Sequence, residues 1–479
     1  WLSPSMPSPD DDWGYDVSDY RAVHPGLGTL AELDRLVAEA ARRGLKVLLD
    51  LVPNHTSSAH PWFVEAASGR DAGKRGYYVW ADPAPGGGPP NNWLSATGDP
   101  AWTLDQRSGQ YYLHNFLPSQ PDLDWWNPAV HREFEEILRF WFDRGVAGFR
   151  IDVAHGLYKD AQLRDNPPAQ PGSHPMLRGK LDPRYNSNRP EVHQVYRDWR
   201  RLAEAYRPPR LLLGETWVFP VERMLSYYGA NDELQLAFNF PFLFSDFSAP
   251  QLAGVVRQTF AGLPDGACPV WTASNHDVSR LTTRWCEGDE RRIRLALLIL
   301  TTLPGTVMLY YGDEIGMTDV DVPLGQQRDA MTRGQNQRTQ RDRARTPMQW
   351  SAQQGAGFTP AGVKPWLPFG DYAAVNVAGQ RDDPGSVLTL VRELIALRHA
   401  RQSGRVVEFA ELAVTQNYWA YCSGDAVVAV NMSGGPAELP ITAGEVLGTT
   451  GTRPDSYPAG QPLRLGAWEG VVLAAPRTR

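Results

Sequence analysis

The sequence predicts an α/β fold in which parallel strands alternate with helices, most simply a (β/α)8 barrel. Short apolar runs recur along the chain, and each is continuous rather than alternating, which is typical of parallel strands covered on both faces. Amphipathic helical patterns stand between these runs. Because so many such units follow one another, we expect a barrel; a doubly wound open sheet is the alternative.

Six apolar runs are expected to be strands, and five patterns between them to be helices. The strands are predicted at Lys46–Val52, Ala147–Val153, Arg210–Glu215, Leu234–Phe240, Cys268–Ala273 and Thr306–Tyr311. Thr29 and Glu32 form a capping box before a run that ends at Arg43, and Asn127 precedes Pro128 as a second helix start. The other helices are predicted at Glu191–Tyr206, Glu290–Leu303 and Val387–Arg401.

Two long interruptions and a change of pattern suggest the domain organisation. Residues 56–125 are too many for a plain loop and predict an inserted subdomain, whereas residues 316–346 form a polar, arginine-rich excursion. Short β-type runs follow the last helix, at Val406–Phe409, Tyr418–Tyr421, Ala426–Asn431 and Gly470–Ala474. We therefore expect a barrel in residues 1–55 and 126–401, an inserted domain in 56–125 and a β domain in 402–479.

Composition excludes several classes of function. The 479 residues carry a net charge of −7 and no basic block, which argues against a nucleic-acid partner. No run reaches about eighteen apolar residues, so no membrane span is expected. Three cysteines, Cys268, Cys286 and Cys422, are too few and odd in number for a disulfide framework. With no visible signal peptide, a cytoplasmic location is expected.

Acidic and polar side chains follow four of the predicted strands, and strand ends of a barrel meet at one rim. The residues expected there are Asp152, Glu215, Asp277, Arg150, His55 and His276. A single acid at a strand end would usually cap a helix, but several buried acids are too costly to gather without a function. The sequence shows no metal-ligand spacing, phosphate-binding glycine loop or nucleophile elbow. Paired carboxylates then indicate a glycosidase.

The four strand-end segments, at residues 50–55, 148–152, 214–217 and 275–277, resemble the signature regions of the α-amylase superfamily, glycoside hydrolase family 13. Segments 12–16, 120–123 and 345–350 are similar to its α-glucosidase and oligo-1,6-glucosidase branch. The resemblance covers essentially the whole chain. It implies a (β/α)8 barrel, a domain inserted after the third strand and a C-terminal antiparallel β-sandwich. The family's β1 strand and first helix, which precede a segment like Trp1–Pro4, are expected to be missing here.

The resemblance implies a role for each matching residue. Asp152 matches the nucleophile, Glu215 the general acid/base, and Asp277 the third carboxylate, which binds sugar hydroxyls and stabilises the transition state. The matching substrate-binding residues are Asp12, Tyr15, His55, Phe116, Gln120, Arg150, Val153, His276 and Arg345. Arg150 also stands two residues before Asp152, so both share one strand face and the guanidinium would keep Asp152 ionised.

The function expected is that of a retaining, exo-acting α-glucosidase on short α-linked gluco-oligosaccharides. Asp12 and Arg345 match the pair that, in the resembling branch, holds the 4-hydroxyl of a terminal glucose and closes the site into a pocket. A valine at the position of Val153 accompanies tolerance of α-1,6 bonds there, so isomaltose-type substrates are expected beside α-1,4 ones.

Two alternatives stay open at this point. One is a transglucosylase or sugar isomerase on the same scaffold. The other is an inactive binding homologue, which is disfavoured because all three acids are present. No cofactor is expected, although a structural calcium ion is left open because some relatives bind one in the N-terminal segment. The partner expected is a small oligosaccharide or α-glucoside, and no oligomeric state is predicted.

Overall fold

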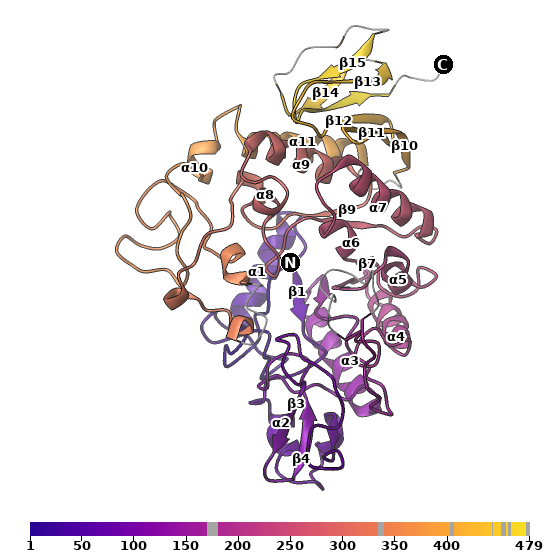
Figure 1. Ribbon diagram of the computed structural model, residues 1–479. Helices are drawn as coiled ribbons and strands as arrows, with labels where there is room; N and C mark the ends of the chain where they lie inside the picture. The colour runs from indigo at the N-terminus through magenta and orange to yellow at the C-terminus, as the bar shows by residue number, and fades with distance from the viewer. Residues whose placement is uncertain are drawn as a thin grey trace. The chain divides into compact units, whose positions relative to one another are not determined.

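A computed structural model describes residues 1–169, 181–333, 340–402, 407–442, 444–451, 457 and 461–475. The chain divides into two compact units, and its elements are labelled as in Figure 1. The first unit comprises Trp1–Phe238 with Asp329–Gln340, and the second comprises Asn239–Arg328 with Arg341–Arg479. The domain boundaries expected near residues 55, 125 and 401 stay predictions.

A parallel sheet organises the first unit. Its strands follow the order β1-β5-β6-β7, with bounds β1 (Leu48–Leu51), β5 (Gly148–Ile151), β6 (Leu211–Gly214) and β7 (Leu236–Ala237). Each strand lies inside the apolar run that predicted it, and nearly all its side chains are buried. The N–H of Leu2 donates to the carbonyl of Leu48 at 2.9 Å, so the first residues run beside β1.

Three helices of the first unit begin within one residue of the predicted start. Before α1 (Leu30–Arg42), Thr29 and Glu32 form the complete capping box, each side chain accepting from the other's backbone N–H. Before α3 (Pro128–Asp143), the Asn127 side chain accepts from the N–H of Ala129. The remaining helices are α2 (Pro61–Ala66), α4 (Val192–Glu204) and α5 (Val221–Leu225). Of these, α4 is the third that begins as predicted, whereas α2 and α5 were not predicted.

The segment between β1 and α3 builds a small sheet of its own, in the lower part of Figure 1. Its antiparallel strands, in the order β2-β4-β3, are β2 (Trp80–Ala81), β3 (Trp102–Asp105) and β4 (Gln110–Leu113). Trp93 and Trp102 stack with ring centroids 5.9 Å apart and form a local core with Leu113. A hydrophobic cluster of its own allows such an insertion to hold a defined shape.

The second unit carries a parallel pair of strands and a set of buried helices. The strands are β8 (Val270–Thr272) and β9 (Thr306–Met308). The longer helices are α7 (Ala249–Gly262), α9 (Glu290–Thr302) and α11 (Val387–Gln402), and the short ones are α6 (Phe240–Leu243), α8 (Leu281–Arg284) and α10 (Val377–Gln380). Of these helices, α9 and α11 were predicted from the sequence, whereas α7 and the three short helices were not.

The C-terminal region is antiparallel β structure in two sheets, as expected. The larger sheet has the order β10-β11-β12-β16-β14, and β13 pairs with β15. The bounds are β10 (Phe409–Val414), β11 (Tyr418–Ser423), β12 (Ala426–Asn431), β13 (Ala437–Thr442), β14 (Val446–Thr449), β15 (Pro462–Leu465) and β16 (Gly470–Ala474). Of the predicted run Val406–Phe409, Val406 lies outside the described residues.

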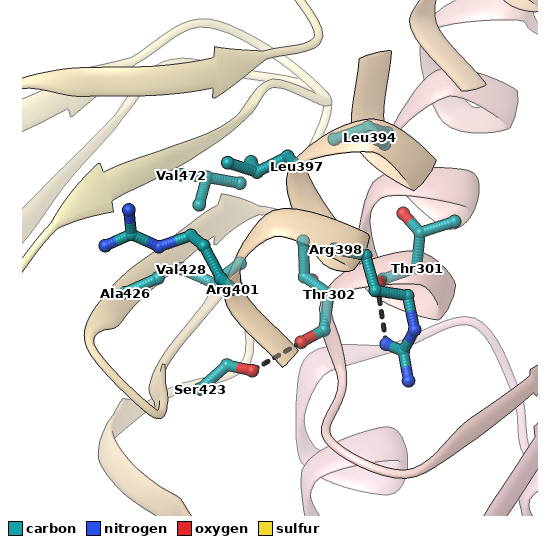
Figure 2. Close-up of a pocket in the computed structure, with 10 residues that line it drawn as sticks. All are labelled: Thr301, Thr302, Leu394, Leu397, Arg398, Arg401, Ser423, Ala426, Val428 and Val472. Carbon is teal, nitrogen blue, oxygen red and sulfur yellow. Dashed lines mark hydrogen bonds between the residues drawn. The ribbon is translucent and has the colours of Figure 1, made fainter. Parts of the chain in front are cut away.

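A small, open hollow lies where α9 and α11 meet the larger C-terminal sheet (Figure 2). Arg398 of α11 donates to the carbonyl oxygens of Thr301 and Leu303 at 2.9 and 2.8 Å, and Ser423 Oγ donates to that of Thr302 at 2.7 Å. These carbonyls end α9 and have no partner within the helix. Arg398 and Ser423 therefore serve to terminate α9.

Among the described residues, no helix is long and apolar enough to cross a bilayer. All three cysteines are free thiols.

Gly148 at the start of β5 provides a test of the strand packing. A Cβ there would meet the backbone carbonyl of Leu211 in β6, closer than any real Cβ contact. We expect Gly148→Ala to lower the free energy of unfolding by about 1–3 kcal/mol, measured by urea denaturation.

Gly254→Ala is the matched control, because a Cβ at this position in α7 meets nothing within 4 Å. It should leave the protein unchanged or stabilise it by up to about 1 kcal/mol, since alanine favours a helix. Equal stability of the two variants would show that β5 and β6 do not approach as described.

Candidate active site

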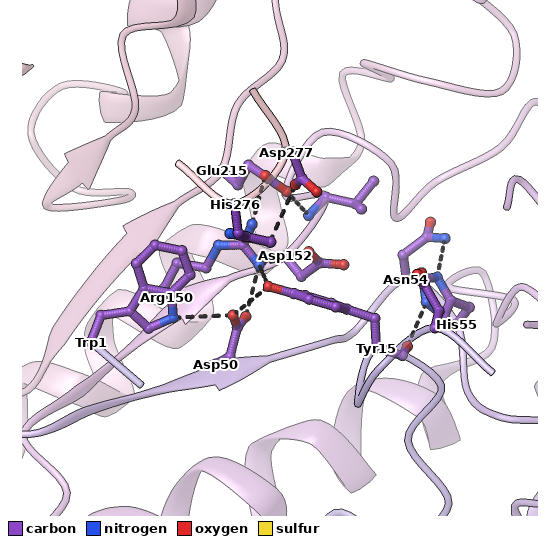
Figure 3. A network of polar contacts seen from close by, with 12 residues as sticks. Trp1, Tyr15, Asp50, Asn54, His55, Arg150, Asp152, Glu215, His276 and Asp277 are labelled. Carbon is purple, nitrogen blue, oxygen red and sulfur yellow. Dashed lines mark hydrogen bonds and ion pairs between the residues drawn. The ribbon is translucent and has the colours of Figure 1, made fainter. Parts of the chain in front are cut away.

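The guanidinium of Arg150, in β5, gathers three carboxylates (Figure 3). Its Nη1 donates to Asp152 Oδ1 at 2.6 Å and to Asp50 Oδ1 at 2.8 Å. Its Nη2 lies 2.6 Å from Glu215 Oε1, an ion pair without hydrogen-bond alignment. All four side chains are buried. The ends of β1, β5 and β6 thus present their acids to one cation.

The charges at this cluster depend on one another. Burial opposes the charge of Arg150, but Asp50 and Glu215 outweigh it and hold its pKa well above the ordinary value. Burial raises the pKa of Asp50 to about 6, while Arg150 opposes this rise and Glu215 adds to it. At neutral pH Asp50 is therefore mostly ionised, and Arg150 is a permanent cation.

Asp50 is in turn held by two aromatic donors. Trp1 Nε1 and Tyr15 Oη each donate to Asp50 Oδ2 at 3.0 Å. The rings of Trp1 and Tyr15 also lie against the guanidinium, with centroids 4.9 and 5.6 Å from Arg150 Cζ. These contacts fix the plane of the guanidinium, and with it the positions of the carboxylates it binds.

Glu215 receives a backbone donor from a strained turn. The N–H of Val153 donates to Glu215 Oε2 at 3.0 Å. Val153 has φ +44°, in the left-handed region that a β-branched residue rarely adopts. Such strain persists where the surroundings impose it, often at functional sites. This turn directs the N–H of Val153, the residue after Asp152, toward the carboxylate of Glu215.

Five of the expected substrate-binding residues lie together in the first unit. His55 Nε2 lies 3.0 Å from the carbonyl oxygen of Tyr15, and Gln120 Nε2 donates to Asp12 Oδ2 at 3.2 Å. The ring of Phe116 lies 5.1 Å from that of His55. Burial lowers the pKa of His55, which favours a neutral imidazole. The group offers polar donors and acceptors beside an aromatic wall.

In the second unit, Asp277 lies among cationic side chains. Arg345 Nη2 and Arg341 Nη1 donate to Asp277 Oδ1 at 2.8 and 2.9 Å. His276 Nε2 lies 3.3 Å from Asp277 Oδ2, and Arg345 Nε donates to the carbonyl of His276 at 2.7 Å. The Asn275 side chain accepts from the N–H of Asp277 and so fixes the turn. Arg345, predicted as a partner of Asp12, binds Asp277 here.

The expected site residues thus form two groups, one in each compact unit. The first holds Asp12, Tyr15, His55, Phe116, Gln120, Arg150, Asp152, Val153 and Glu215, and the second holds His276, Asp277 and Arg345. The pairing of Asp12 with Arg345 spans the two units and stays a prediction.

Sequence reasoning gave no role to Arg341, Lys159 or Asp122. Arg341 lies in the polar, arginine-rich segment 316–346, which was a signal for it. The chain has only five lysines, and this scarcity could have singled out Lys159. No set of three His, Cys, Asp or Glu side chains suited to a metal occurs in the described part of the chain. The structural calcium left open from the sequence is untested.

Comparison with known sequences gives a consistent result. The model of the α-amylase catalytic domain matches residues 1–405. The α-glucosidase of Culex pipiens is 38% identical over 424 residues, which cover 85% of this chain and 69% of that protein. The oligo-1,6-glucosidase of Heyndrickxia coagulans is 35% identical over 438 residues, which cover 84% of this chain and 77% of that protein.

Solved structures are similar over nearly the whole chain. The α-glucosyl transfer enzyme XgtA superposes with a TM-score of 0.91 at 35% identity, covering 99% of this chain and 91% of that one. The trehalulose synthase MutB from Pseudomonas mesoacidophila MX-45 superposes with a TM-score of 0.89 at 28% identity and the same coverage.

Replacing Arg150 should make stability depend strongly on pH. Arg150→Met leaves the carboxylates of Asp50, Asp152 and Glu215 buried without their cation. Because Arg150 opposes the rise that burial causes in the pKa of Asp50, its loss raises that pKa further above the unfolded value of about 4. The native variant then binds protons that the unfolded chain releases, so its stability falls as pH rises through the raised pKa values. We expect a loss of about 3–5 kcal/mol at neutral pH, measured by urea denaturation.

The loss should shrink at about pH 5, where the carboxylates of the variant are largely protonated. Arg150→Lys is the control, because it retains the charge and should lose less. If Arg150→Met lost the same free energy of unfolding at both pH values, Arg150 would not be the cation that these carboxylates share.

Proposed function

The chain belongs to the α-amylase catalytic-domain family, and from this premise we propose that it is a retaining, exo-acting α-glucosidase. It has the family's (β/α)8 barrel with an inserted subdomain and a C-terminal antiparallel β region. The observation that carries the proposal is the sharing of Arg150 by Asp152 and Glu215. Two carboxylates that reach one guanidinium fit the short separation, about 5–5.5 Å, of retaining glycosidases.

The proposed reaction is a double displacement. The ionised Asp152 attacks the anomeric carbon while Glu215 donates its proton to the leaving glycosidic oxygen, which forms a β-glucosyl-enzyme. Glu215, now a carboxylate, accepts a proton from water, and the water oxygen displaces Asp152. Two inversions release α-glucose. Arg150 keeps Asp152 anionic, and the N–H of Val153 stabilises the anionic form of Glu215.

The substrate class proposed is short α-linked gluco-oligosaccharides and α-glucosides. Asp12, Gln120 and His55 offer a cluster of buried polar groups suited to the hydroxyls of one terminal sugar. The relatives named α-glucosidase and oligo-1,6-glucosidase support this choice. We propose that Asp12 and Arg345 close the site into a pocket that accepts a non-reducing glucose end.

The experiment that tests the proposal follows products from a panel of substrates. Wild-type protein should release glucose, first as the α-anomer, from p-nitrophenyl α-glucoside and short oligosaccharides. Initial formation of β-glucose, or rapid internal cleavage of soluble starch, would overturn the assignment.

Glucosyl transfer is the second candidate, because the similar solved structures include enzymes named for α-glucosyl transfer and trehalulose synthesis. In that case the glucosyl-enzyme would pass its sugar to another sugar instead of water. Chromatography of products at a high sugar concentration distinguishes the two, since a transferase forms oligosaccharides or sucrose isomers in excess of free glucose.

The cellular setting proposed is the reducing cytoplasm. The support for it is that Cys268, Cys286 and Cys422 are all free thiols, as is usual where disulfides do not persist.

Loss of the Asp152 carboxylate should abolish turnover without unfolding the protein. We expect Asp152→Asn to lower kcat by at least about 10³-fold, because only the nucleophile is lost. Azide added to Asp152→Gly should take the place of the carboxylate and yield β-glucosyl azide, identified by NMR. Formation of the α-azide, or kcat near the wild-type value in Asp152→Asn, would show that Asp152 is not the nucleophile.

Val153 is predicted to influence the choice of linkage. Its side chain follows the nucleophile, and a hydroxyl added there changes the hydrogen bonds available to the leaving sugar. We expect Val153→Thr to shift the ratio of kcat/KM for isomaltose over maltose downward by about 10- to 200-fold, the range of about 1–3 kcal/mol for such a contact. An unchanged ratio, or a wild type that ignores isomaltose, would remove Val153 as the determinant.

A further inference from the structure

A buried lysine, Lys159, lies beside Asn54, in the segment between β5 and α4. Lys159 is only 3% exposed. Its Nζ lies 2.7 Å from Asp122 Oδ2 and donates to Asn54 Oδ1 at 2.8 Å. A third contact, at 3.3 Å, is to the carbonyl oxygen of Leu157. The proposed reaction gives this lysine no part.

The ammonium determines which way the amide of Asn54 faces. An ammonium group can only donate, so the oxygen of Asn54, and not its NH2 group, must point toward Lys159. The NH2 group then points the other way, and its Nδ2 lies 3.1 Å from His55 Nδ1 and 3.2 Å from Asp122 Oδ2.

The orientation of Asn54 in turn determines the tautomer of His55. Because Nδ2 of Asn54 is a donor, His55 Nδ1 must be the unprotonated, accepting nitrogen. The ring proton is then on Nε2, which lies 3.0 Å from the carbonyl oxygen of Tyr15, an acceptor. Both nitrogens of the imidazole are therefore satisfied in only one neutral form.

We propose that Lys159 is a positioning residue that fixes the tautomer of His55 through Asn54. The result is a neutral imidazole whose Nε2–H donates to the carbonyl oxygen of Tyr15, which fixes the ring among the proposed sugar-binding residues. The charged groups near His55 are Asp122, Asp12 and Lys159; the two acids favour the imidazolium and the lysine disfavours it. Burial, the largest effect, also disfavours it.

Asp122 does not perform this task alone. Its Oδ1 accepts from the backbone N–H of Asn115 and its Oδ2 from Asn115 Nδ2, both at 2.8 Å. Without Lys159 the oxygen of Asn54 loses the donor described for it, and only the 3.2 Å contact between Asn54 Nδ2 and Asp122 Oδ2 opposes a turn of the amide. After such a turn the oxygen would face His55 Nδ1 and draw the proton there. His55 Nε2 would then carry a lone pair that faces the carbonyl of Tyr15 and can accept from Gln120 Nε2, 3.2 Å away.

The tautomer is observed directly by ¹⁵N NMR of histidine-labelled protein, in which a pyridine-type and a pyrrole-type nitrogen have well-separated shifts. His55→Gln identifies the His55 signals. Wild-type protein should show pyrrole-type Nε2, and Lys159→Met should show either the reverse or a mixture. An unchanged tautomer in Lys159→Met overturns the proposal.

Kinetics give a second readout. Lys159→Met should lower kcat/KM for p-nitrophenyl α-glucoside by about 10- to 100-fold, by analogy with the loss of groups that orient metal-ligating histidines. In the His55→Ala background the same change should cost less than about threefold, because Lys159 acts through His55. Equal losses in both backgrounds would mean a merely structural role and would overturn the proposal.

Asn54→Asp covers the case in which Lys159→Met does not fold. A carboxylate at this position accepts from Lys159 and from His55 Nδ1–H together, so we expect the reversed tautomer in a folded protein; an unchanged tautomer contradicts the proposal. Arg197→Met is the matched control, because it removes a cation 2.6 Å from buried Glu233 without contacting Asn54 or His55. It should leave the tautomer as in wild type.

The role of Lys159 rests on the proposed function in one respect only, namely that the site around His55 binds a sugar. If wild-type protein does not act on α-glucosides, the proposed function fails while the NMR test still decides the tautomer. If wild type is active and the NMR and double-mutant results are negative, only the role of Lys159 fails.

Discussion

One buried guanidinium holds the reactive part of this protein together. Asp50, Asp152 and Glu215 come from the ends of three strands, and each would resist ionisation in a dry interior without a cation nearby. Arg150 supplies that cation. Its planar guanidinium also fixes the directions in which the carboxylates are bound. The proposed nucleophile and acid/base therefore stand in a defined relation before any substrate binds.

The sheet makes this arrangement possible because its register brings the right residues side by side. Asp50 of β1 pairs directly with Arg150 of β5, and Ile151 pairs with Gly214, so that Glu215 follows at the same level as Asp152. Alternation along β5 then places Arg150 and Asp152 on one face. A shift of the register by one residue would direct these side chains to the opposite face.

Local signals in the sequence were sufficient for the parallel strands and for the starts of the longer helices other than α7. The capping box at Thr29 and the apolar run around β5 each predict structure from a few neighbouring residues. Helix α7 was missed because its apolar residues are interrupted by glycines and small residues. Three of the C-terminal strands, β13 to β15, were missed because β13 and β15 alternate exposed with buried residues instead of forming a continuous apolar run, and β14 is only four residues long.

For the candidate site, residue types at strand ends indicated the acids, but not the groups that control them. Lys159 and Asp122 are 37 residues apart in sequence, and nothing local marks them as an ion pair. Two of the buried cations, Arg150 and Lys159, have opposite effects on proton positions. Arg150 keeps a proton away from Asp152, whereas Lys159, through Asn54, keeps one on His55 Nε2. A site that breaks a glycosidic bond needs an unprotonated nucleophile and neutral polar groups around the sugar. Arg150 and Lys159 can only donate hydrogen bonds, so Arg150 keeps Asp152 as an acceptor, and Lys159, through Asn54, keeps His55 in one neutral form.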